Sequence, residues 1–156
     1  MDIKKITQLQ KRILNLMEKY EAVTRKLLDC ETDDILMLTE KRKNIWYETS
    51  KLDEQVKIEC GDDAQAISAY KNECDRGSLP QELFEVFDLR QQLNAIIFRV
   101  KALDPEINER IAIIRDNLIV KIKKNNSGQN AKAAKYANAA RPTGKNVFFP
   151  ENKKMI

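Results

Sequence analysis

The sequence contains no histidine, and its 156 residues include only 4 glycines, 4 prolines and 3 cysteines. Without histidine the chain lacks the commonest general base and a principal metal ligand, and no glycine-rich phosphate loop or nucleophile motif is present. We therefore expect no enzyme activity and no catalytic, cofactor-binding or metal-binding residue. Cys30, Cys60 and Cys74 are odd in number and widely spaced, which is typical of reduced, buried thiols rather than of a disulfide framework.

Long hydrophobic runs are also missing. Charged residues make up 33% of the chain and recur every few positions, so no stretch reaches the roughly 20 apolar residues that a membrane-spanning helix needs. The first residues, Met1 to Lys5, do not begin the apolar core of a signal peptide. We predict a cytosolic protein that is not inserted in a membrane.

Aliphatic and charged residues, by contrast, are abundant and have helical spacing. In residues 2–29 two series of apolar residues repeat every seven positions, which is the pattern of a helix packed lengthwise on another helix. The two series are Ile6, Ile13, Tyr20 and Leu27, and Leu9, Leu16, Val23 and Cys30. A second helix, over residues 33–60, has a weaker seam in which Arg42 and Thr49 occupy apolar positions.

Turn signals at Gly61 and at Gly77-Ser78 divide the rest of the chain. They predict a short helix over residues 62–75, or a kinked continuation of the second helix, and a long helix over residues 81–124. Within the long helix we expect Pro105 to cause a kink rather than an end, because the seven-residue seam continues through it to Ile114. The fold predicted for residues 1–124 is all-α, an elongated antiparallel hairpin or bundle of three to four helices. We favour the continuous hairpin.

Residues 125–156 differ in composition and are predicted to form a basic, flexible tail, with a short helix over 130–140 as an alternative. From residue 121 onward nine basic residues face one acidic residue, a net charge of +8, whereas residues 1–120 carry a net charge of −4. Nucleic-acid binding by this tail is disfavoured, because its aromatic residues are not interleaved with the basic ones.

The five phenylalanines lie in two places, the helix 81–124 and the tail. Phe84, Phe87 and Phe98 fall within about 60° of one another on a helical wheel, far from the centre of the main seam. This stripe either lies under another segment, such as the helix 62–75 or the tail, or forms a groove for an amphipathic partner helix. Phe84, Phe87, Phe98, Phe148 and Phe149 are therefore candidate partner-binding residues.

Several of these features occur together in one known family. They are the heptad-patterned first helix, Leu38-Thr39-Glu40-Lys41-Arg42 in the second helix, the element Leu103-Asp104 inside an apolar helix, and a basic stretch that leads through Lys135 to Tyr136. In these features the chain resembles the flagellar type III export chaperones of the FliT and FlgN type. The Leu103-Asp104 element makes it slightly more similar to FliT.

The resemblance implies a cytosolic chaperone that binds the amphipathic C-terminal helices of a flagellar filament-cap or hook-associated protein and delivers this client to the export gate. It assigns client binding to the Phe84–Phe98 face and contact with the export-gate protein to Tyr136. Two other functions stay open: a structural coiled-coil adaptor that dimerises through its first helix, and a helical nucleic-acid-associated protein. The sequence is compatible with a monomer or a homodimer.

Overall fold

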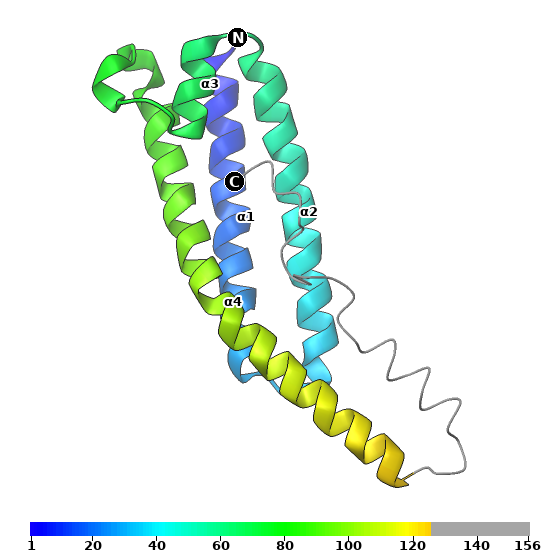
Figure 1. Cartoon of the computed structure of the whole chain (residues 1–156). Helices are drawn as coiled ribbons and strands as arrows, with labels where there is room; N and C mark the ends of the chain where they lie inside the picture. Colours follow the sequence, from blue (N-terminus) through cyan, green and yellow to red (C-terminus); the bar gives the residue numbers. More distant parts are fainter. Residues whose placement is uncertain (126–156) are drawn as a thin grey trace.

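The computed structural model describes residues 1–125, and this part of the chain is a bundle of α-helices without a strand. The two long helices α2 and α4 pack against α1, and the short helix α3 packs at one end (Figure 1). The predicted all-α class is confirmed. The helices span Ile3–Asp29 (α1), Ile35–Cys60 (α2), Ala64–Lys71 (α3) and Phe84–Asn125 (α4), with 3₁₀ turns at Thr32–Asp34, Arg76–Ser78 and Gln81–Leu83.

The seven-residue pattern places α1 at the centre of the bundle, in contact with both α2 and α4. Asp2 begins the helix by accepting a hydrogen bond from the backbone N–H of Lys5 at 3.2 Å. Leu16 and Cys30, from the second apolar series, are half-buried. The buried members of the two series are Ile6, Leu9, Ile13, Tyr20, Val23 and Leu27, none of them more than 5% exposed. The apolar seam of α1 is thus buried in the core of the bundle.

The weaker seam of α2 is buried in spite of its polar residues. Arg42 and Thr49 are both 0% exposed. The Thr49 hydroxyl donates to the backbone carbonyl of Ile45 at 2.9 Å, which satisfies it within its own helix. Arg42 pairs with the Asp104 carboxylate of α4 at 3.0 Å.

After α2 the chain folds back, in contrast to the continuous hairpin that we favoured. Gly61 ends α2 with a φ of 58°, in the left-handed region that glycine adopts without strain. Asp63 then begins α3, its carboxylate accepting the N–H of Ala66 at 2.9 Å. The helix ends at Lys71, before the predicted residue 75, because Asn72 adopts a φ of 55° and closes it.

A buried hydrogen bond and close packing hold α3 in place. Ala66 and Ala69 are both 0% exposed, and such small side chains allow α3 to lie close to α4. The Tyr70 hydroxyl donates to the Asp53 carboxylate at 2.5 Å, and Lys57 pairs with the same carboxylate at 2.7 Å. Burial raises the pKa of Tyr70, so its hydroxyl stays protonated and remains a donor.

The helix α4 continues through Pro105, as the seam predicted. Figure 1 shows that its second half takes a different direction, passes the turn between α1 and α2 and runs on beyond the bundle. A proline inside a helix removes one hydrogen bond and crowds the preceding turn, which favours such a bend. Ile107 is 0% exposed, and no later residue of α4 is fully buried. We call residues 108–125 the α4 tip.

Candidate partner-binding surface

The three phenylalanines of α4 do not share one exposed stripe. Phe87 is 7% exposed and belongs to the core, whereas Phe98 is 76% exposed. Phe84 is half-buried, with the guanidinium of Arg76 4.2 Å from its ring centre. The Asn72 amide also donates to the Phe87 carbonyl at 3.1 Å, so the segment around α3 contacts α4 at this end. Tyr136, Phe148 and Phe149 lie outside the described residues.

The α4 tip carries two of the three exposed large hydrophobic side chains of this helix, the third being Phe98. Six of the ten residues 113–122 are isoleucine, leucine or valine, and no other helix within residues 1–125 covers them as α1 and α3 cover the first half of α4. Ile113 is 53% exposed and Val120 is 63% exposed. The other four are half-buried: Ile114, Leu118, Ile119 and Ile122. The sequence signal for this surface is the apolar seam of α4, which continues to Ile114, past the part of the helix that packs against the bundle.

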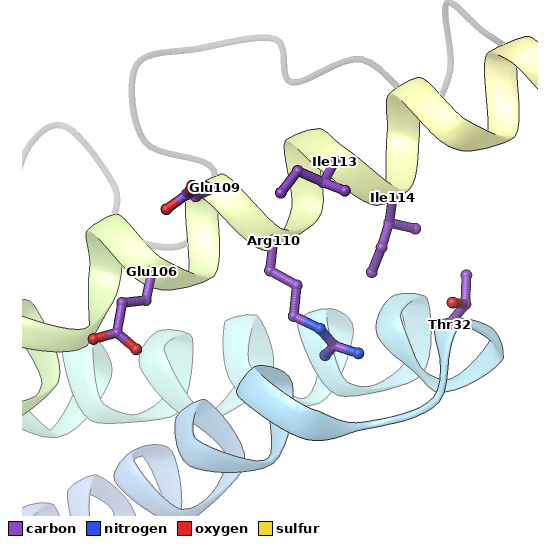
Figure 2. A pocket seen from close by; sticks show the side chains of 6 residues that line it. All are labelled: Thr32, Glu106, Glu109, Arg110, Ile113 and Ile114. Atoms are coloured by element: carbon purple, nitrogen blue, oxygen red, sulfur yellow. The ribbon is translucent and has the colours of Figure 1, made fainter.

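An open hollow of about 440 Å³ lies between the start of the tip and the turn that joins α1 to α2. Figure 2 shows Arg110 and Ile114 extending from α4 toward this turn, where Thr32 forms the opposite side. Two exposed carboxylates, those of Glu106 and Glu109, also line the hollow, as does Ile113. The hollow therefore combines negative charge with aliphatic walls, which suits a segment that is both basic and apolar.

Arg110 fixes one side of this hollow. Its guanidinium donates to the backbone carbonyls of Leu27 and Cys30 at the end of α1 and lies 3.4 Å from the Cys30 sulfur. The last carbonyls of a helix lack partners in the helix itself, and a cation near them also stabilises the helix dipole. The tip is thus attached to the bundle at its first turn, and the positive charge of Arg110 is directed onto α1.

A buried cationic cluster sets the position of α4 just before the tip. The Arg42 guanidinium, 0% exposed, pairs with the Asp104 carboxylate at 3.0 Å, and its central carbon lies 4.7 Å from the centre of the Tyr20 ring. The Trp46 ring packs 5.8 Å from that of Tyr20. Burial raises the pKa of Tyr20, so the ring beside Arg42 stays neutral. This cluster ties all three long helices together at the residue that precedes Pro105.

Within residues 1–125 the cysteines and the acidic residues form neither a disulfide nor a group that could hold a metal ion. The three cysteines are free: Cys60 is buried, and Cys30 and Cys74 are half-buried. Burial raises the pKa of the Cys60 thiol to about 11, which makes it unreactive at neutral pH. No group of histidine, cysteine, aspartate and glutamate side chains in the described part of the chain has the arrangement needed to hold a metal ion.

Comparison with protein-family models, curated proteins and solved structures found no match to this chain. None of the helices within residues 1–125 is long and apolar enough to cross a membrane. What the fold defines is a helical bundle whose longest helix carries an apolar tip beyond the core.

Proposed function

We propose that this protein binds an amphipathic helix of another protein on the α4 tip. The observation that carries the proposal is the cluster of exposed and half-exposed aliphatic side chains in residues 113–122. The exposed Ile113 and Val120 are seven residues apart, so they lie along one side of the helix, opposite the half-buried Ile111, Leu118 and Ile122. An extended apolar side of a helix is the surface that a second amphipathic helix matches.

Within that function, we propose the more specific role of a cytosolic export chaperone of the flagellar type. The family resemblance supports it, since Asp104 of the Leu103-Asp104 element has a physical task here, the neutralisation of the buried Arg42. The client would be a filament-cap or hook-associated protein with an amphipathic C-terminal helix. Tyr136 would contact the export-gate protein. The exposure of the tip supports client binding there rather than on the Phe84–Phe98 face.

A titration of the full chain with the C-terminal helical segment of a flagellar cap or hook-associated protein tests this proposal. We expect Val120→Asp to weaken binding at least tenfold, because Val120 is 63% exposed on the tip and the change places a charge in the apolar contact. Phe98→Asp is the matched control: Phe98 is equally apolar and 76% exposed but lies outside the tip. Both variants should keep the thermal midpoint of the parent, since neither side chain belongs to the core.

If only Phe98→Asp weakens client binding, the client binds on the Phe84–Phe98 face instead of the tip. The absence of binding by the parent protein to any such segment would refute the chaperone role.

The structural adaptor is the second candidate, in the form in which α1 dimerises. Its apolar seam is already buried against α2 and α4, which leaves no free seam for a second copy of α1. This observation favours the helix-binding function at the tip.

A further inference from the structure

We infer that, in the absence of a client, two copies of this chain associate through their α4 tips in an antiparallel arrangement. The inference rests on the proposed function, because it uses the same exposed surface of the α4 tip. It adds that a second copy of the same chain binds this surface in the free protein. Ile113 and Val120 are more than half exposed, and a cluster of bare aliphatic side chains on a helix favours self-association.

The charges of α4 decide the direction of the pairing. Glu106 and Glu109 lie at or just before the start of the α4 tip, and Lys121 and Lys124 lie near its end. All four side chains are exposed. Each glutamate has a lysine 15 residues further along the chain, about 22 Å along a helix that rises 1.5 Å per residue. Parallel pairing would place like charges side by side, whereas antiparallel pairing places each acidic end beside a basic end.

The spacing also defines a register with twofold symmetry. With the axis at Arg115, Glu106 of one copy lies level with Lys124 of the other, and Glu109 lies level with Lys121. A twofold axis repeats every such contact, so the four residues form four pairs of opposite charge. Arg115 itself is already paired with Asp116 at 3.2 Å, and the axis therefore does not bring two uncompensated cations together.

The hollow beside the α1–α2 turn receives the end of the second tip in this register. Its acidic residues, Glu106 and Glu109, are the ones that face the partner's lysines, and Ile113 and Ile114 provide the aliphatic wall. The negative end of the α1 dipole offsets part of the charge of Arg110, because its guanidinium donates to the last carbonyls of α1. The two bundles lie at opposite ends of the pair, since each tip extends away from its own bundle (Figure 1).

Sedimentation equilibrium of the full chain, without any client, measures the association. We expect a reversible dimer. Reversing the acidic end (Glu106→Lys with Glu109→Lys) should raise the dimer dissociation constant at least tenfold, and so should reversing the basic end (Lys121→Glu with Lys124→Glu). Combining all four substitutions should restore the dissociation constant to within threefold of the parent value, because the opposite charges then meet again. Circular dichroism should show the same helix content for every variant.

The control variants are Lys43→Glu and Glu48→Lys, which reverse exposed charges on α2 and should leave the dissociation constant unchanged. A monomer at every concentration overturns the inference and leaves residues 126–156 or a client as the occupant of the tip. Failure of the fourfold variant to recover overturns the antiparallel register.

These outcomes are independent of the proposed function. A monomeric protein whose tip still binds a client helix refutes only the dimer, and a dimer that binds no client helix refutes only the chaperone role. Where both hold, addition of the client segment should convert the dimer into a complex of one chain with one client.

Discussion

Replacing Asp104 by asparagine removes the negative charge that faces Arg42 inside the bundle while keeping the size of the side chain. Arg42 is 0% exposed and lies 3.0 Å from the Asp104 carboxylate, so its charge would remain in the interior without its counter-charge. Breaking one side of a buried ion pair typically costs about 3–5 kcal/mol. We expect the lower end of this range, because the Tyr20 ring stays beside the guanidinium.

A loss of about 3 kcal/mol lowers the midpoint of thermal unfolding by roughly 6–12 °C in a chain of this size. Circular dichroism melting curves and urea titrations of the parent and the Asp104→Asn variant measure the change. Hydrogen exchange of the α4 tip should also become faster, because Asp104 holds α4 to α2 directly before Pro105. The exchange of α3 serves as the internal reference, since a separate hydrogen bond fixes α3.

The double substitution Arg42→Met with Asp104→Leu completes the test. Apolar residues of similar size can replace a buried ion pair at little cost in stability, so the double variant should be more stable than Asp104→Asn alone. A loss below about 1 kcal/mol for Asp104→Asn, the range of an exposed ion pair, would refute the view that this pair is a buried anchor of α4.

Four further predictions concern other parts of the chain. Tyr70→Phe removes the hydrogen bond to Asp53 and should lower the free energy of unfolding by about 1–2 kcal/mol in urea titrations, since a buried carboxylate loses a donor; an unchanged midpoint would contradict the role given to this bond. With a thiol reagent at neutral pH, Cys60 should react more slowly than Cys30 or Cys74, because burial raises its pKa to about 11. Equal labelling rates at the three cysteines, measured by mass spectrometry, would contradict this prediction. Removal of residues 125–156 should shift the thermal midpoint by less than about 10 °C, because the buried core within residues 1–125 ends at Ile107; a larger drop would make the removed residues part of the core. Tyr136→Ala should preserve stability and client binding but weaken pull-down of an export-gate protein, and equal recovery by mutant and parent would remove that role.

Much of the helical architecture could be predicted from the sequence because its signals are local. The seven-residue series of α1 requires an apolar contact along the whole helix, and its members from Ile6 to Leu27 are buried as a seam in the structure. The continuation of α4 through Pro105 is equally local, since the spacing of apolar residues on both sides of the proline fits a single helix.

Other features depend on residues that are far apart in the chain. The fold-back at Gly61 was the alternative that we did not favour, because a glycine followed by two aspartates fits a kinked helix as well as a turn. Sequence spacing also marked Arg42 as an irregularity in a seam. Only the tertiary structure supplies its partner, Asp104, which lies 62 residues further along the chain.

The candidate binding surface shows most clearly which features can be read from the sequence and which depend on the fold. A helical wheel places Phe84, Phe87 and Phe98 on one side of a helix, but it contains no information about what lies against that side. In the folded chain α3 and the residues after it contact α4 at the first two phenylalanines, whereas the third stays exposed. The α4 tip is a candidate surface for the opposite reason, the lack of a covering helix within residues 1–125. The apolar composition and helical spacing of residues 113–122 can be read from the sequence, but only the fold shows that no other helix within residues 1–125 covers them, because α4 runs on beyond the bundle (Figure 1).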